Sequence, residues 1–255
     1  MVISMERWRG KVAIVTGASS GVGAGIAEKL VEEGLQVVGL ARRKEKMEEL
    51  AKKLEGKSGK LYPIKTDVTK EEEILQAFKW VKENLGPIHV LVNSAGIMRK
   101  TNLREGDTTM WKEIFDTNTL ALCITTREAI KDMRANNVDG HIIHINTIGG
   151  HTVPNFEYLS VYSGAKWGVT ALTETLRQEL NSIKSKIRIT SISPGVVFTE
   201  LIANAGICEH SQLESFYKDA ASLVPEDIGD AVVYVLSTPQ HVQVHELIIR
   251  ANGET

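Results

Sequence analysis

Short runs of β-branched and apolar residues alternate with longer, helix-length segments along most of this chain of 255 residues. Such runs are typical of strands buried on both faces, and the segments between them carry apolar residues at helical spacing. Strands that are separated by helices pair in parallel through right-handed crossovers. The pattern therefore predicts an α/β fold with a single doubly wound parallel sheet and helices on both of its faces.

No repeat, low-complexity stretch or flexible linker interrupts this alternation, so we expect one domain over residues 1–255. The expected strands are at 11–15, 36–40, 61–66, 89–93, 141–146, 187–193 and 245–250, and the expected helices at about 21–33, 44–54, 71–84, 107–136 and 162–182.

The composition excludes several functions. The hydrophobic fraction is 42%, the charged fraction is 24% and the formal net charge is −2, which favours neither a nucleic acid nor an anionic membrane as a partner. Cys123 and Cys208 form no metal-ligand motif and the histidines show no ligand spacing, so we expect no metal. No apolar stretch approaches the ~20 residues that span a bilayer, and a signal-peptide pattern is missing, so we expect a cytoplasmic protein.

A glycine-rich segment, Thr16-Gly17-Ala-Ser-Ser-Gly21-Val-Gly23, lies between the first expected strand and the first expected helix. Glycines at such a turn let the backbone approach a pyrophosphate, which then binds at the helix N-terminus. A lone glycine triplet is weak evidence, but its place between a strand and a helix strengthens it. We therefore predict a Rossmann-like dinucleotide site, with cofactor contacts from Gly17, Ser19, Ser20, Gly21, Val22 and Gly23.

The end of the second strand indicates which dinucleotide binds. An acidic residue there would hold the ribose 2′-hydroxyl, but this chain has Ala41 followed by Arg42 and Arg43. Guanidinium groups suit a 2′-phosphate, so NADP(H) is preferred over NAD(H), with Arg42 favoured as the ligand. For Arg43 the opening of a solvated, charged helix is an equally good interpretation.

Tyr162 and Lys166 lie one turn apart on the same face of an expected helix. A free phenol titrates near ~10, and a neighbouring ammonium favours its ionised form. We expect this pair to exchange a proton with a substrate oxygen near neutral pH. A chance Tyr-x-x-x-Lys on an amphipathic helix is the alternative, which the rest of the chain disfavours.

Together these segments resemble the short-chain dehydrogenase/reductase family over nearly the whole chain. The matching segments, in order, are Thr16 to Gly23, Asp67-Val68, Asn93-Ser-Ala-Gly96, Asn118, Tyr162-x3-Lys166 and Ser193-Pro-Gly-Val-Val-Phe-Thr199. Local similarities, such as Met5-Glu-Arg-Trp8, point to the branch of farnesol dehydrogenases and 17-beta-hydroxysteroid-type reductases.

The resemblance implies a role for each matching residue. Tyr162 would be the general acid/base, Lys166 would tune it and bind the nicotinamide ribose, and Asn118 would anchor a water that relays protons. Asp67 would contact the adenine beside Val68, although it could instead cap a turn. The remaining cofactor contacts implied are Asn93, Ala95, Gly96, Pro194, Gly195, Val197 and Thr199.

Two positions depart from the family's pattern. Ser94 replaces the second asparagine of Asn-Asn-Ala-Gly, which we expect to affect sheet support more than chemistry. Thr147 stands at the position of the catalytic serine, two residues further from Tyr162 than is common. Its hydroxyl can still bond a substrate oxygen, while its methyl crowds the pocket, so we expect altered specificity or a reduced rate.

The substrate is less constrained by the sequence. We expect residues 200–223 to cover the active site, with an apolar lid from Leu201, Ile202, Leu213, Phe216 and Tyr217; helix packing is the alternative. The resemblance implies a small apolar alcohol or ketone, either an isoprenoid alcohol such as farnesol or a steroid. A general carbonyl reductase and a non-catalytic NADP-binding sensor are the alternatives, and the family implies a homodimer or homotetramer.

Overall fold

The computed structural model describes residues 3–156, 159–218 and 220–254. Within these residues a seven-stranded sheet has the order β3-β2-β1-β4-β5-β6-β7, and every neighbouring pair is parallel. The strands are β1 (Val12–Thr16), β2 (Gln36–Ala41), β3 (Lys60–Lys65), β4 (Ile88–Asn93), β5 (His141–Ile145), β6 (Arg188–Pro194) and β7 (Glu246–Ile249). The expected doubly wound sheet is confirmed.

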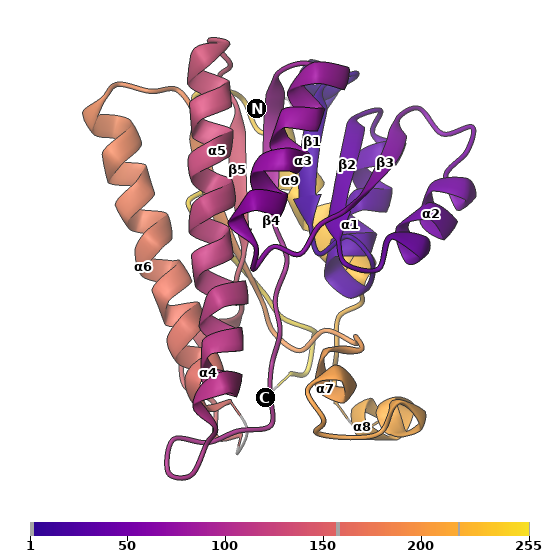
Figure 1. Ribbon diagram of the computed structural model, residues 1–255, viewed down its shortest axis with the longest axis vertical. Coiled ribbons are helices and arrows are strands. Elements are labelled where there is room, and N and C mark those ends of the chain that lie inside the picture. Colours follow the sequence, from indigo (N-terminus) through magenta and orange to yellow (C-terminus); the bar gives the residue numbers. More distant parts are fainter. Residues whose placement is uncertain (1–2, 157–158, 219, 255) are drawn as a thin grey trace.

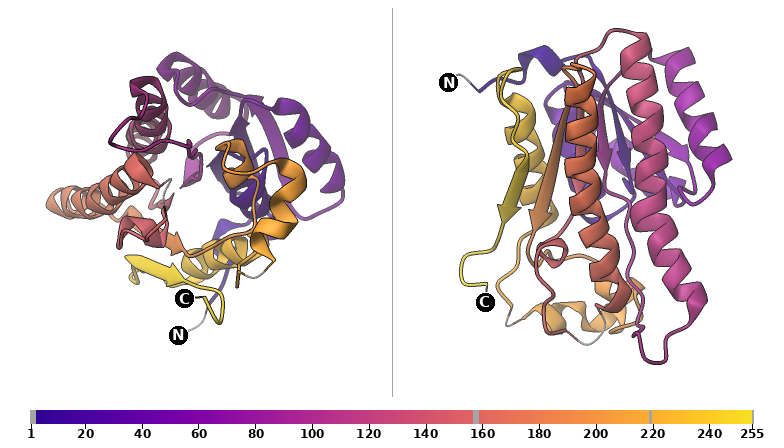
Figure 2. Two further views of the ribbon diagram at one scale, coloured as in Figure 1. Left: turned by 90° about the horizontal axis from the view of Figure 1, so that it is seen from below. Right: turned by 90° about the vertical axis from the view of Figure 1, so that its left-hand side faces the viewer.

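Helices cover both faces of this sheet (Figures 1 and 2). One face carries α1 (Gly21–Glu32), α2 (Lys44–Lys53) and α9 (Pro225–Ser237), and the other carries α3 (Glu71–Asn84), α5 (Ala121–Ala135) and α6 (Ser160–Ser182). A further helix, α4 (Thr108–Phe115), continues into α5 through a π-helical turn, Asp116–Leu120.

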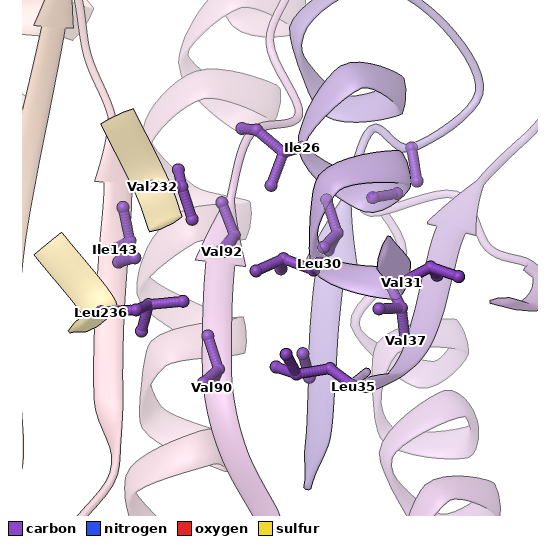
Figure 3. Close-up of a cluster of buried hydrophobic side chains, with 14 of the residues drawn as sticks. Ile26, Leu30, Val31, Leu35, Val37, Val90, Val92, Ile143, Val232 and Leu236 are labelled. Carbon is purple, nitrogen blue, oxygen red and sulfur yellow. The ribbon is translucent and has the colours of Figure 1, made fainter. Parts of the chain in front are cut away.

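The core explains the consecutive apolar residues of the central strands. Val90 and Val92 of β4 face α1 and α9, where Leu30 and Val232 pack against them (Figure 3). Leu91, between those two valines, belongs to the cluster on the opposite face. Because successive side chains of a strand point to opposite faces, a strand covered on both sides favours apolar residues at successive positions.

The first residues of the chain are bound to the end of the last helix. Trp8 donates its indole N–H to the carbonyl of Leu236 at 2.8 Å, and Arg7 donates to the carbonyls of Leu236 and Thr238. Arg188, at the start of β6, donates to the Thr238 hydroxyl, and its burial lowers its pKa to about 10. The side chains of Arg7 and Trp8 thus satisfy carbonyls that the end of α9 leaves unpaired.

The expected strands and helices are present, with ends shifted by one or two residues, but two regions differ in detail. The expected helix over 107–136 is divided by the π-helical turn. The helix α9 was not predicted, although its first turn carries two start signals. Pro225 is its first residue, and the Asp227 carboxylate accepts a hydrogen bond from the Val224 amide, as in a capping box. Over 200–223 the chain forms α7 (Leu201–Asn204), a short 3-10 turn and α8 (Leu213–Tyr217).

Candidate active site

A cavity of about 940 Å³ opens beyond the carboxyl ends of the strands. Its walls come from the segments that follow β1 to β6, and α7 and α8 lie across it, below the sheet in Figure 1. From β1 the chain adds β2 and β3 on one side of the sheet and then β4 to β7 on the other, so the strand order reverses between β1 and β4. Ligands of open parallel sheets bind at such a switch point.

The glycine-rich turn forms one end of the cavity. Gly17 has φ +73°, and a Cβ there would lie 2.9 Å from the Cα of Ala95, so only glycine fits between the two loops. A Cβ on Gly23 would collide with the carbonyl oxygen of Gly17. The loop after β1 is therefore held close against both the loop after β4 and the start of α1.

The start of α1 is suited to an anion. Ser20 is its N-cap residue, but the side chain makes no capping hydrogen bond, and the first turn carries no acidic residue. Gly21, Val22 and Gly23, whose backbone N–H groups have no partner within the helix, line the cavity. Uncapped donors at the positive end of a helix dipole fit a pyrophosphate.

Thr16 organises the same region. Its hydroxyl oxygen accepts hydrogen bonds from the backbone N–H groups of Ser94 and Ala95, both at 3.0 Å. The side chain is almost fully buried and joins the end of β1 to the loop after β4. Thr16 belongs to the glycine-rich segment, but no role was predicted for its side chain. Its position at the end of a strand, directly before Gly17, was the available signal.

Two arginines border the cavity beside this turn. Arg42 is exposed, whereas Arg43 is half-buried and donates to the Ser20 hydroxyl at 2.5 Å. Arg43 also lies 3.5 Å from the carboxylate of Glu200, which follows β6. Arg42 therefore has the freer side chain, while Arg43 is already held in place.

Asp67 closes a turn and lines the cavity as well. One carboxylate oxygen accepts from the Thr69 amide at 3.0 Å and from the Thr69 hydroxyl at 2.7 Å. Burial opposes ionisation, but these bonds and the charge of Arg42 hold the pKa of Asp67 below its ordinary value. Both interpretations of Asp67, as a turn cap and as a cavity residue, agree with its placement.

The structure brings most of the predicted residues into this one cavity. The lining includes Gly17, Ser19, Ser20, Gly21, Val22, Gly23, Arg42, Arg43, Asp67, Val68, Ala95, Gly96, Thr147, Tyr162, Lys166, Pro194, Gly195, Val197 and Thr199.

Asn93 and Asn118 lie outside the described lining of that cavity. Asn93 is the buried last residue of β4, and its side-chain amide donates to the Thr126 hydroxyl while its side-chain oxygen accepts from the Thr125 hydroxyl. The side chain therefore ties β4 to α5, and the predicted cofactor contact of Asn93 stays a prediction. Its position in the Asn-Ser-Ala-Gly segment could not reveal partners more than thirty residues away.

The side chain of Asn118 is likewise committed to the protein. It accepts from the Ile97 amide at 2.8 Å and donates to the Ile97 carbonyl at 2.9 Å, which fixes the loop after β4. Asn118 lies in the π-helical turn, where the regular hydrogen-bond ladder is interrupted. The two bonds to Ile97 use one of the two N–H groups and one of the two lone pairs of the amide, and the water relay at Asn118 stays a prediction.

Tyr162 and Lys166 are both buried, on the first turns of α6. Burial lowers the pKa of Lys166 to about 8 and raises the pKa of Tyr162 above its ordinary value. The expectation that Lys166 lowers the tyrosine pKa is wrong for this arrangement. The ammonium group donates to the Ile145 carbonyl at 2.8 Å and lies 6.0 Å from the tyrosine ring centroid, so desolvation of the phenol dominates. Tyr162 is consequently a neutral phenol at physiological pH.

Thr147 begins a short 3-10 turn directly after β5. Its hydroxyl oxygen accepts a hydrogen bond from the Gly149 amide at 3.3 Å, an interaction that leaves the hydroxyl proton available for donation. The side chain is half-buried and lines the cavity together with Tyr162.

A buried polar chain lies behind these groups. His144 of β5 contacts the Thr173 hydroxyl at 2.9 Å and the Thr126 hydroxyl at 3.3 Å. Because Thr173 donates its proton to the Val169 carbonyl, the δ nitrogen of His144 must carry the hydrogen and the ε nitrogen must accept. Burial, with the charge of Lys166, lowers the pKa of His144 to about 3, so the imidazole stays neutral.

The segment after β6 is supported by the last residues of the chain. Glu254 accepts from the Val196 amide at 3.2 Å, and its carboxylate occupies the space that a side chain on residue Gly195 would need. Glu254 and Glu200 both line the cavity, and neither was singled out from the sequence. Their positions depend on tertiary contacts that local patterns do not reveal.

The far end of the cavity is apolar. Tyr162, Met98 and Ala205 form a small buried cluster, and the residues packed against it are Phe156, Leu159, Leu201, Ile202 and Ile207. Tyr217 of α8 is buried, with its ring 4.9 Å from that of Phe198. Of the residues expected to form an apolar lid, Leu201, Ile202, Phe216 and Tyr217 line the cavity and Leu213 is not among the described lining residues, so the covering role of 200–223 stays a prediction.

The described residues contain no cluster of His, Cys, Asp and Glu that could hold a metal ion. In the same part of the chain, none of the helices has the length and apolar character needed to cross a bilayer.

With this fold and site, the chain belongs to the short-chain dehydrogenase family, an oxidoreductase family whose model matches residues 11–216. The chain is 49% identical to farnesol dehydrogenase from Aedes aegypti over 98% of its length and 99% of that protein. It is 47% identical to dehydrogenase/reductase SDR family member 11 from Bos taurus over 96% and 98% of the two chains. A serine dehydrogenase in complex with NADP+ superimposes with a TM-score of 0.85 at 29% identity, covering 93% and 94% of the chains.

Because Lys166 is buried, we expect the free energy of unfolding to depend on pH. Its folded-state pKa of about 8 lies below the ordinary lysine value, so at neutral pH folding must bury a charge. This cost is fully present below pH 8 and disappears as the pH rises from there toward about 10.4. Lys166→Met should therefore be more stable than the wild type at pH 7, by up to about 3 kcal/mol, and the difference should shrink by pH 10. Urea unfolding at pH 7 and pH 10 measures the stability difference between the two proteins. A difference that grows with pH would contradict a lowered pKa for Lys166.

Proposed function

We propose that the protein is an NADP(H)-dependent oxidoreductase that interconverts an alcohol and a carbonyl on a small apolar substrate. This proposal rests on the cavity beyond the carboxyl ends of the strands. It joins a glycine-rich turn with two arginines at one end to Tyr162 and Lys166 in the middle and to an apolar cluster at the other end. The residues present fit a dinucleotide, since the uncapped start of α1 suits its pyrophosphate and Arg42 suits a 2′-phosphate.

When bound, the nicotinamide would supply and accept the hydride, which is chemistry that no side chain can provide. The protein's own residues handle the substrate oxygen. Tyr162, held as a neutral phenol by its burial, donates its proton to that oxygen in the reductive direction and takes it back in the oxidative one. Thr147 donates a hydrogen bond to the same oxygen and polarises the carbonyl. Lys166 holds positive charge below pH 8 next to the developing alkoxide.

The apolar end supports an isoprenoid alcohol such as farnesol, or a steroid, as the substrate. Met98, Leu201 and Ile202 present hydrocarbon to the cavity, and burial of a matching apolar surface favours binding by roughly 25 cal/mol per Å². The similarity to farnesol dehydrogenase agrees with this choice. A general carbonyl reductase would instead accept small polar ketones with equal efficiency.

Replacing Tyr162 tests the proposed acid. Tyr162→Phe removes only the hydroxyl, so we expect NADPH binding to be retained while kcat falls by about 10²–10⁴-fold. Fluorescence titration measures NADPH binding. A panel of alcohols and ketones, followed at the nicotinamide absorbance, measures kcat. An active Phe variant would refute the assignment. Wild-type protein that binds NADPH but turns over no member of the panel would favour a non-catalytic sensor.

Replacing Thr147 tests the proposed hydrogen-bond donor. Thr147→Ser keeps the hydroxyl and should keep kcat/KM within about tenfold, whereas Thr147→Ala should lower it by about 10²–10³-fold because a donor to the reacting oxygen is lost. Steady-state kinetics on the best substrate of the panel gives both values. If the Ala variant matches the wild type, another group performs this role.

The exposed side of α4 and α6 supports a homodimer or homotetramer. Phe115, Leu120 and Trp167 expose 41%, 54% and 46% of their surfaces, and their helical segments pack side by side. Trp111 instead packs in a buried cluster and bonds Thr101, so it contributes to the core. Large exposed apolar groups that gather on one face are typical of subunit interfaces.

We therefore expect sedimentation velocity to show a dimer or tetramer at micromolar concentration. Trp167→Glu should shift the protein toward monomer, because the interface would bury an unpaired charge. Leu103→Glu, on a loop residue that is 70% exposed, is the matched control and should leave the mass unchanged. A monomeric wild type would exclude the assembly.

A further inference from the structure

A carboxylate occupies the same corner of the cavity as the proposed phosphate ligands. Glu200 is the N-cap residue of α7 and so begins the segment that covers the site. Its two oxygens each lie 3.5 Å from a cation: one from Arg43 Nη1 and the other from Lys46 Nζ of α2. These contacts join parts of the chain more than 150 residues apart in sequence.

Glu200 is ionised at neutral pH. Burial opposes its charge, but Lys46 and Arg43 outweigh this effect and hold the pKa of Glu200 below its ordinary value. Arg43 is therefore shared: Nη2 donates to the Ser20 hydroxyl and Nη1 faces the carboxylate. Part of the guanidinium's capacity to bind an anion is thus already used by the protein.

A 2′-phosphate that binds beside Arg42 and Arg43 would meet this negative charge. The phosphate and the carboxylate would draw on the same donors of Arg43, and like charges within a few ångströms repel. A cofactor that carries a 2′-hydroxyl instead of the phosphate would not be opposed in this way.

We infer that Glu200 is a specificity-determining residue that competes with the cofactor's 2′-phosphate for Arg43 and Lys46. Glu200 limits the preference for NADP(H) over NAD(H) and leaves the contacts common to both cofactors unchanged. This inference rests on the proposed function. It also links the two ends of the cavity, because Leu201 and Ile202, directly after Glu200, pack against the cluster around Tyr162.

The test compares two nucleotides that differ in one group. Isothermal titration calorimetry with 2′,5′-ADP, which carries the 2′-phosphate, and with 5′-AMP, which does not, isolates this corner from nicotinamide binding and from turnover. Glu200→Gln removes the charge while keeping the shape. We expect it to bind 2′,5′-ADP roughly three- to tenfold more tightly than the wild type at low ionic strength, with the affinity for 5′-AMP unchanged within about twofold.

Two controls make the result specific. Glu48→Gln removes an equal charge from α2, where Glu48 pairs with Lys44 at 3.1 Å and is not among the described lining residues. It should leave both affinities unchanged. In an Arg43→Gln background, the gain from Glu200→Gln should shrink, because the shared cation is gone. Thermal unfolding verifies that each variant is folded, and Glu200→Ala serves as a second charge-removing variant.

The outcomes separate this inference from the proposed function. No gain for Glu200→Gln and Glu200→Ala, or an equal gain for Glu48→Gln, overturns the inference while wild-type binding of 2′,5′-ADP still supports the NADP(H) site. A wild-type protein that binds neither nucleotide overturns both. A gain that appears equally with 5′-AMP also overturns it, since the competition then does not involve the 2′-phosphate.

Discussion

The close approach of two loops at the centre of the sheet is the constraint on which the rest of the site depends. Gly17 lies against Ala95 with no room for a side chain, and the Thr16 hydroxyl fixes the backbone of that same loop. These contacts hold the glycine-rich turn at the point where strand order reverses. The start of α1 then faces the cavity, and the loop after β4 leads on to Met98 at the apolar end. One packing contact thus positions both halves of a long binding site.

Burial determines what the central residues can do. The same low-dielectric surroundings favour the neutral form of the Tyr162 phenol and lower the pKa of Lys166. A protonated phenol is a donor, which suits a group that must deliver a proton to a substrate oxygen. The neutral His144 behind it adds no competing charge, and its threonine partners fix its tautomer.

Local pattern was sufficient for the doubly wound parallel sheet, for most helices and for the glycine-rich turn. These features arise from burial on two faces and from backbone conformation, both of which leave periodic or steric traces in a sequence. Local pattern was insufficient where the partner of a side chain is distant in sequence. Asn93 sits in a matching motif, yet Thr125 and Thr126 of α5 take both ends of its amide. The pKa of Tyr162 depends on desolvation that only the assembled core creates, and Glu200 and Glu254 reach the cavity through tertiary packing.

The bonds from Arg7 and Trp8 to the end of α9 have a consequence for how this chain folds. Their partners lie about 230 residues further along the chain, so the carbonyls at the end of α9 are satisfied by side chains that are synthesised much earlier. Contacts of such high sequence separation carry a loop-closure cost and cannot form until α9 has been synthesised. Until then α1 lacks α9 beside it, and the part of the sheet's apolar face that α9 covers stays exposed. The nascent chain therefore exposes this hydrophobic surface until α9 has been made, a period in which a chaperone would shield it from aggregation.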